Sequence, residues 1–430
     1  MPVFKALSRK LLALCALPLV VAAPAGAETV ALSGATLIDG TGAAPVRDSV
    51  IVVTDGRITA VGPRASVSIP AGARTVNVSG KTIMPGIVNA HAHVEGNRRS
   101  TAPLAQQLGD QLALYARYGV TTVYSLGDDG VESVKLARET REKSQAGTLD
   151  RARLFVSGPV LNATDAADGR KNVAENAARG VDIIKVRLEG PADAPIRQPA
   201  VYGAMIDQAH KEGKRIAIHM FTADETKGVV DAGVDVLAHS IRDRDADPAL
   251  IGAIKARNIP YIPTLTRDLS VFVYESKPDF AADPFFTKEA AYRPDWATVS
   301  APEFQARIKN QPSAQAIKPA LDQAKLNLKA LSDAGVLIAM GTDSGAGIGR
   351  WQGYFEHVEM AMMAQAGLTP MQVIVASTGN AAKAMRIDDQ VGTLQPGKRG
   401  DLLVLAASPL TDITHTKTLE QVWIDGRQVN

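Results

Sequence analysis

Residues 83–93 read Ile83-Met84-Pro85-Gly86-Ile87-Val88-Asn89-Ala90-His91-Ala92-His93, an apolar run rich in β-branched residues that ends in two histidines. Residues i and i+2 of a strand point to the same face, so the run predicts a strand that aims both imidazoles at one place. Two converging neutral imidazoles are suitable metal ligands. Short pairs of this kind also occur by chance on surfaces, so the metal hypothesis depends on ligands supplied elsewhere in the chain.

After His93, short apolar runs alternate with amphipathic segments. Strands are predicted at 120–126, 153–161, 181–187, 215–220, 234–239, 259–265 and 336–340. Helices are predicted at 131–143, 199–212, 222–232, 248–257 and 320–333. With the histidine-bearing strand, this alternation supplies the eight strands that close a (β/α)8 TIM barrel. We therefore predict an α/β fold whose barrel spans residues 86–388.

The two ends of the chain have a different pattern. Residues 28–85 and 389–430 contain short alternating runs, with Asp55-Gly56 and Asp425-Gly426 as turn signals. We expect both segments to form one small discontinuous β-sandwich domain. Residues 268–318 are rich in aromatic residues, show little helix or strand signal, and follow the seventh strand. This insertion is either a lid over the site or a segment that its aromatics fix to the barrel wall.

Residues 1–27 have the features of a secretory signal: basic residues, an apolar core, and the Ala25-Gly26-Ala27 cleavage pattern. The bulky Leu14 before Cys15 makes a lipoprotein signal the weaker alternative. We expect an exported protein, periplasmic or secreted. The apolar run is too short to span a membrane, and no later one is long enough.

Removal of this segment would take three of the 47 basic residues and leave 44 against 45 acidic residues. A net charge of −1 does not indicate a nucleic-acid partner. Removal would also take Cys15, the chain's single cysteine. The mature chain would therefore have no disulfide, no cysteine nucleophile and no thiolate ligand.

Four further residues with suitable chemistry lie at or near predicted strand ends: Lys185, His219, His239 and Asp343. Each alone has an ordinary explanation, such as a hydrogen-bonded core histidine or a carboxylate that caps a helix. Together they are more informative, because the carboxyl ends of barrel strands meet at one mouth. We therefore expect all four beside His91 and His93.

This ordered set resembles the amidohydrolase superfamily, as do Pro85-Gly86 and the terminal Gly397-Lys398-Arg399-Gly400-Asp401-Leu402. The resemblance covers nearly all of the chain after residue 27. The nearer branch is similar to imidazolonepropionase-related amidohydrolases, including Xaa-Pro dipeptidases and ochratoxinase-type amidases. The bridging lysine argues against the deaminases and true imidazolonepropionases, which use one metal.

The resemblance implies a site with two divalent metal ions and a homo-oligomeric enzyme. His91, His93 and Asp343 would hold one ion. His219 and His239 would hold the second. Lys185 would be carbamylated by CO2 to N6-carboxylysine and bridge the two ions. Nitrogen and oxygen ligands suit Zn²⁺, with Mn²⁺ or Co²⁺ as alternatives. Asp343 would act as the catalytic general base and then as the acid.

The leading hypothesis is a hydrolase that cleaves an amide of an N-acyl amino acid or dipeptide, with an aromatic group in the insertion. Candidate partners for a substrate carboxylate are Arg98, Arg99, Arg187, Arg242 and Arg350. Relatives often carry a carbonyl-polarising histidine after strand 3, and residues 159–168 contain none. The alternatives are a lactonase or phosphotriesterase on the same binuclear site, and a non-catalytic binding protein on this barrel.

Overall fold

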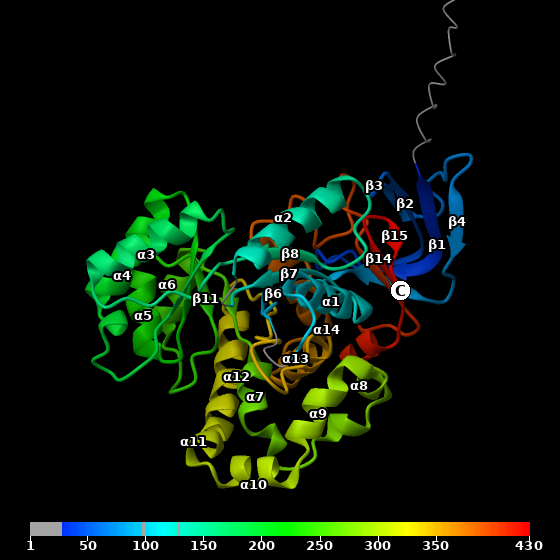
Figure 1. Ribbon diagram of the computed structural model, residues 1–430. Coiled ribbons are helices and arrows are strands. Elements are labelled where there is room, and N and C mark those ends of the chain that lie inside the picture. The colour runs from blue at the N-terminus through cyan, green and yellow to red at the C-terminus, as the bar shows by residue number, and fades with distance from the viewer. Residues whose placement is uncertain (1–27, 97–99, 128–129) are drawn as a thin grey trace, which may run out of the picture.

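The computed structural model describes residues 28–96, 100–127 and 130–430 (Figure 1). The expected signal segment and two candidate arginines, Arg98 and Arg99, lie outside these residues. Within the described ranges, no helix combines the length and the apolar character that crossing a membrane needs.

Parallel strands occupy the centre of the molecule. Three pair in the order β6-β7-β8 and four in the order β12-β11-β10-β9. Their bounds are β6 (Ile87–Ala92), β7 (Val120–Ser125), β8 (Arg153–Val156), β9 (Ile184–Arg187), β10 (Ile216–His219), β11 (Val236–Ala238) and β12 (Tyr261–Ile262). Nearly every residue in them is buried. Burial on both faces is what parallel strands covered by helices require.

Backbone hydrogen bonds join the two sheets. The Leu161 amide donates to the Lys185 carbonyl over 2.8 Å, which links the segment after β8 to β9. On the other side, Tyr261 of β12 pairs with Ile338. The Ala90 amide of β6 then donates to the Met340 carbonyl over 3.0 Å. The strand predicted at 336–340 is thus reduced to one bridge and a few backbone bonds, but it still lies between β12 and β6.

Helices follow the strands along the chain and bury their apolar faces against them. Their bounds are α1 (Leu104–Arg117), α2 (Val131–Gln145), α3 (Ala166–Ala178), α4 (Pro199–Lys211), α5 (Ala223–Asp231), α6 (Pro248–Ala256), α12 (Ile317–Asp333), α13 (Tyr354–Gln365), α14 (Pro370–Ala376) and α15 (Gly379–Ala384). Local signals explain their starts: Thr222 caps α5 in a capping box, and Pro248 begins α6 after Asp247. This α/β arrangement positions the carboxyl ends of the strands at one mouth.

Strands from both termini form a separate mixed sheet (Figure 1, blue and red). They are β1 (Thr29–Leu37), β2 (Val46–Thr54), β3 (Arg57–Pro63), β4 (Arg74–Asn77), β5 (Thr82–Pro85), β13 (Leu402–Leu405), β14 (Leu419–Ile424) and β15 (Arg427–Gln428). Where a β-sandwich was expected, the structure has one sheet. The reason is that β5 pairs with both β1 and β13, so the two terminal segments extend one another edge to edge.

The insertion is more regular than its sequence indicated. Short helices fill it: α7 (Leu265–Phe272), α8 (Pro284–Thr287), α9 (Arg293–Val299), α10 (Pro302–Asn310) and α11 (Pro312–Gln315). Each is too short to produce a clear helical period, although prolines mark the first turns of α8 to α11. Phe286 packs with ring centroids 5.1 Å from both Tyr292 and Trp351, so the aromatics mainly fix the insertion to the barrel.

A buried ionic cluster connects the barrel to the mixed sheet. Arg153 of β8 contacts Asp401 over 2.8 Å and Asp425 over 3.0 Å. Arg399 lies 3.4 Å from the same Asp425 oxygen. All four side chains are at most 6% exposed. We call these four residues the Arg153 cluster.

Candidate metal centre

The four predicted histidines and the aspartate meet at the carboxyl ends of the strands. His91 lies near the end of β6 and His93 directly follows it. His219 is the last residue of β10, and His239 directly follows β11. Asp343 follows the segment that pairs with β12. All five side chains line one cavity of about 220 Å³, together with Lys185 from β9.

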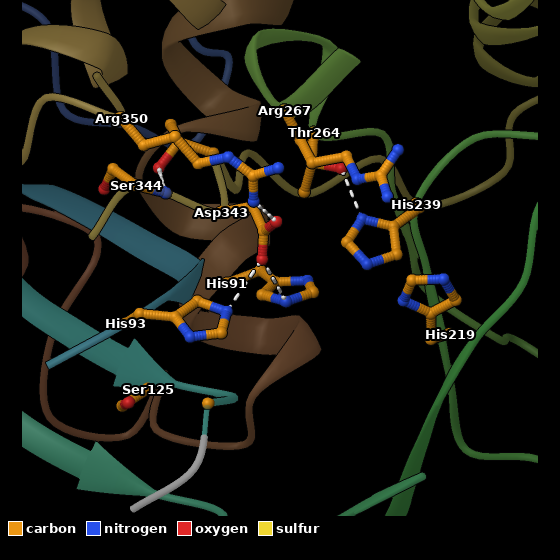
Figure 2. A network of polar contacts seen from close by, with 12 residues as sticks. His91, His93, Ser125, His219, His239, Thr264, Arg267, Asp343, Ser344 and Arg350 are labelled. Carbon is orange, nitrogen blue, oxygen red and sulfur yellow. Dashed lines mark hydrogen bonds and ion pairs between the residues drawn. The ribbon is translucent and has the colours of Figure 1, made fainter. Parts of the chain in front are cut away.

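The imidazoles and the carboxylate are close enough to share a metal ion (Figure 2). One Asp343 oxygen, Oδ1, lies 3.2 Å from His91 Nε2 and 2.8 Å from His93 Nε2. The His239 ring lies 4.7 Å from the His91 ring and 4.3 Å from the His219 ring, between centroids. Ligand atoms of His91, His239 and Asp343 all lie within 4.8 Å of one another. His239 was expected to bind the second ion with His219. It therefore also lies beside two expected ligands of the first ion, His91 and Asp343.

Among the residues that the structure describes, four side chains that line this cavity have a buried nitrogen without a hydrogen-bond partner: Lys185 Nζ, His91 Nδ1, His219 Nε2 and Arg187 Nε. The Glu189 carboxylate lies 3.6 Å from His219 Nε2. A buried polar atom without a partner costs free energy of about 1–3 kcal/mol. Such atoms are expected where a ligand or ion completes the site. Nitrogen lone pairs beside a carboxylate, with no thiolate, fit Zn²⁺ or a similar divalent cation.

Burial sets the ionisation of most of these groups. It lowers the pKa of His91 to about 3, and it lowers the pKa values of His219 and His239 well below the ordinary value. Burial also lowers the pKa of Lys185 to about 7, which Asp343 only partly opposes. Neutral imidazoles and a partly neutral amine have free lone pairs. The neutral imidazoles can therefore bind a metal ion, and the lysine amine can act as a nucleophile.

Asp343 is held as a carboxylate. Burial alone would raise its pKa, but Arg350 and His93 outweigh burial and hold the pKa well below the ordinary value. Arg350 donates a short hydrogen bond to Asp343 Oδ2. For His93, burial is outweighed by Asp343 and Glu95, which raise its pKa to about 9. His93 thus differs from the other three histidines, because two carboxylates flank it.

Backbone strain is concentrated at this mouth. His239, Thr264 and Asp343 have φ values of +76°, +49° and +59°, which residues other than glycine seldom adopt. Strain of this kind persists where surrounding contacts impose it, and it clusters at functional sites. Thr264 Oγ1 lies 2.6 Å from His239 Nδ1, so a strained residue also fixes a histidine ring.

Two buried glutamates of α13 accept hydrogen bonds from the segments that carry the site residues. Glu359 accepts hydrogen bonds from the Leu265 and Thr266 amides over 2.8 and 2.7 Å, at the start of α7 next to Thr264. Glu356 accepts from Asn89 over 2.5 Å and from Ser344 over 2.8 Å, which joins β6 to the loop that carries Asp343. Sequence reasoning missed both, although acidic residues three positions apart in an apolar helix were a usable signal.

The cavity has a cationic rim. Arg187, Arg267 and Arg350 line it, whereas no residue of 159–168 does. Arg267 was missed from the sequence, and in Figure 2 it lies above the histidines near Arg350.

Arg242, which was a candidate, instead pairs with buried Asp268 and stacks 3.5 Å from the Phe221 ring centroid. Arg267 also contacts Asp268, over 2.9 Å. The two arginines therefore share one counter-charge.

Comparisons with known proteins agree with this geometry. The chain is 28% identical over 180 residues to an uncharacterised protein of Mycobacterium tuberculosis, and the match spans 47% of that relative's length. It is 25% identical over 414 residues to an imidazolonepropionase of Saccharopolyspora erythraea, covering 88% of this chain and 94% of the relative. Among solved structures, a candidate prolidase from Bifidobacterium longum superposes with a TM-score of 0.75. That structure is 27% identical and is covered over 94% of both chains.

The family model matches residues 82–429, a range that contains every candidate ligand. The fold also matches that of TIM-barrel amidohydrolase structures. By this match over most of its length, the chain belongs to the amidohydrolase family.

Proposed function

We propose that this amidohydrolase is a binuclear metal-dependent enzyme that cleaves the amide bond of an N-acyl amino acid or dipeptide. One observation supports the proposal most strongly: His91, His93, Lys185, His219, His239 and Asp343 all line one cavity. Three of these residues carry buried nitrogens without partners. A purely structural cluster would be expected to satisfy these atoms internally.

The ligand assignment that fits these residues has two halves. His91, His93 and Asp343 would hold one cation, and His219 and His239 the other. Lys185 lies in the same cavity, and its amine has no partner. Addition of this amine to CO2, with loss of one proton to water, would give a carbamate whose oxygens could reach both cations. Zn²⁺ suits this donor set, with Mn²⁺ or Co²⁺ as alternatives.

Bound divalent cations supply Lewis acidity, which polarises a carbonyl and makes water more acidic. The chain supplies the proton transfer. Asp343, ionised and fixed by its neighbours, takes the proton of the attacking water on a carboxylate oxygen. It then delivers that proton to the departing nitrogen, so that the products are a carboxylic acid and a free amine. Thr264 would keep the His239 ring in one orientation through its hydrogen bond at 2.6 Å.

The cationic rim supports an anionic substrate. Burial lowers the pKa of Arg350, and the Arg267 guanidinium lowers it further, although Asp343 opposes both effects. A carboxylate bound between two guanidinium groups would relieve that repulsion. An adjoining cavity of about 660 Å³ shares Arg350 with the metal cavity and is bordered by Tyr292 and Trp351. We assign the substrate's aromatic group to this second cavity.

Hydrolysis assays of N-acyl-phenylalanine and Xaa-Pro panels in the presence of Zn²⁺ test the proposal. The expected product is free amino acid, which Asp343→Asn should release far more slowly than the wild type. N-acetyl-phenethylamine, which lacks the carboxylate, should be a poor substrate.

Arg267→Gln should lower kcat/KM for N-acyl-phenylalanine by about 10²-fold, because the substrate carboxylate loses a charged partner. It should leave kcat/KM for the neutral N-acetyl-phenethylamine unaffected. Cleavage of lactones or phosphotriesters without any amide cleavage would favour the alternative hydrolase instead.

Carbamylation of Lys185 has its own test. Metal-loaded protein prepared with ¹³C-bicarbonate should show a carbamate carbon resonance that is absent from Lys185→Met.

We also infer export and cleavage after residue 27. Protein recovered from the exporting cell should begin at Glu28, and a mature chain that keeps the basic start would contradict this inference. Light scattering would test the expected homo-oligomer.

A further inference from the structure

A second charged cavity lies at the opposite end of the barrel. It has a volume of about 730 Å³, within the range of small-molecule sites. Arg215, Asp235 and Pro260, which line it, directly precede β10, β11 and β12. It is therefore at the amino ends of the strands, whereas the metal-ligand candidates are at the carboxyl ends. We call it the barrel-floor cavity.

Five cationic side chains converge on the barrel-floor cavity: Arg215, Lys255, Arg257, Lys383 and Arg386. Asp235 is the one carboxylate among its lining residues. Asp235 is already engaged, because its Oδ2 accepts the Ile216 amide over 2.9 Å and lies 2.9 Å from His210. The excess of positive charge is therefore not neutralised from within the cavity.

Only Arg257 has a counter-charge outside the cavity among the described residues. Arg257 lies 3.7 Å from Asp231 and donates to the Val230 carbonyl. Among the residues that the structure describes, no ion pair involves Lys255, Lys383 or Arg386. These three are exposed at the cavity margin, and Arg215 lies deeper.

Arg215 distinguishes this cavity from an ordinary solvated basic surface. It is half-buried, and its Nε is a buried donor with no hydrogen-bond partner. Burial lowers its pKa, and the nearby Arg386 guanidinium lowers it further. Like charges held together in this way destabilise the folded chain. An anion in the cavity would neutralise the cations and give the free Nε an acceptor.

We propose that the barrel-floor cavity binds a small oxyanion that carries at least two negative charges. Arg215 and Arg386 present planar guanidinium groups, which match the paired oxygens of a phosphate or carboxylate. Lys255 and Lys383 add point charges at the margin. Phosphoryl compounds and dicarboxylates share this chemistry. The site is independent of the amide hydrolysis proposed above.

The test is a calorimetric titration of the metal-loaded full chain with inorganic phosphate or with malonate, at constant ionic strength and with sodium chloride as the reference. At least one of the two should bind saturably, and the tighter one identifies the class of ligand. Lys383→Gln/Arg386→Gln should weaken that binding by about 10-fold or more, because charge-assisted hydrogen bonds are lost. Both residues are exposed, so the variant should fold.

Two controls make the result decisive. Lys171→Gln/Lys309→Gln removes the same charge from distant exposed positions and should bind like the wild type. Arg267→Gln alters the metal cavity and should reduce only anion binding at that site; the binding that depends on Lys383 and Arg386 should stay intact. The proposal is overturned if neither anion binds, or if the Lys383/Arg386 variant binds as tightly as the wild type. It is equally overturned if binding is lost in Arg267→Gln instead.

Discussion

Two buried clusters of charged side chains in this protein follow opposite rules. In the Arg153 cluster, each arginine faces a carboxylate within 3.4 Å. In the metal-ligand cluster, the Lys185 amine and two imidazole nitrogens have no hydrogen-bond partner among the residues that the structure describes. Both clusters are almost completely buried. Only the first is close to being internally neutralised, although Asp425 Oδ2 and Arg399 Nε have no hydrogen-bond partner among the described residues.

The difference separates a structural role from a functional one. Buried charges are costly, so a cluster that only joins two parts of a fold must pair them. A cluster that binds ions must leave lone pairs available, and the folded chain is less stable for it. Removal of a residue should therefore have opposite effects at the two places: lost stability at Arg153 and lost activity at the metal centre. The predictions below test this contrast.

The largest effect is expected for Asp343→Asn. Loss of the general base should lower kcat by about 10²–10⁴-fold, the usual contribution of positioned acid–base catalysis. Thermal stability should also fall, but by less than in a variant that loses the side chain, because the amide keeps the shape of the carboxylate while Arg350 and His93 lose its charge. Steady-state assays and calorimetry measure both quantities. A variant with full activity would remove Asp343 from the mechanism.

The reverse outcome is expected for Arg153→Met. Two aspartates would lose their main buried partner, so the free energy of unfolding should fall by about 3–5 kcal/mol. Urea denaturation measures this change. The activity of the molecules that remain folded should be near that of the wild type. The double variant Arg153→Met/Asp401→Asn should recover part of the stability, because it removes the unpaired carboxylate charge, keeps an acceptor for the Asp425 amide and leaves Arg399 paired with Asp425.

Glu359→Gln should have an intermediate effect on function. The amide replaces one of the two oxygens that accept from the Leu265 and Thr266 amides with a donor, so Thr264 and the His239 ring should become less fixed. Changes of this kind behind metal ligands cost about 10–100-fold in metal affinity or activity. Competition with a zinc-binding dye measures the affinity. Glu303→Gln, at an exposed position in α10, is the matched control.

The smallest effect is a pH dependence of stability in metal-free, CO2-free buffer. Burial lowers the pKa of Lys185 to about 7, below its value in the unfolded chain. Between pH 7 and about 10 the unfolded chain therefore binds the additional proton, so this residue makes stability rise with pH, by up to about 1.4 kcal/mol per pH unit. Lys185→Met should lack this gain. Urea midpoints of both proteins at pH 7.5 and 8.5 give the comparison, and parallel changes would contradict it.

The sequence alone determined which residues the structure brings together at the metal centre. A strand has a period of two, so His91 and His93 had to share a face. The alternation of strands and helices requires the carboxyl ends of parallel strands to meet, and this brought His219, His239 and Asp343 into the same prediction. These rules are local or topological, so a single chain reveals them.

Tertiary structure decided the rest. Arg267, Glu359 and the barrel-floor cations belong to no local motif, and contacts between residues far apart in the chain give them their surroundings. The short helices of the insertion are stabilised by aromatic packing on the barrel, and β5 joins the terminal strands into one sheet through pairings that no local pattern encodes. Sequence periodicity reports which face of an element is buried. Burial against particular partners sets charge and affinity, and only the folded chain shows those partners.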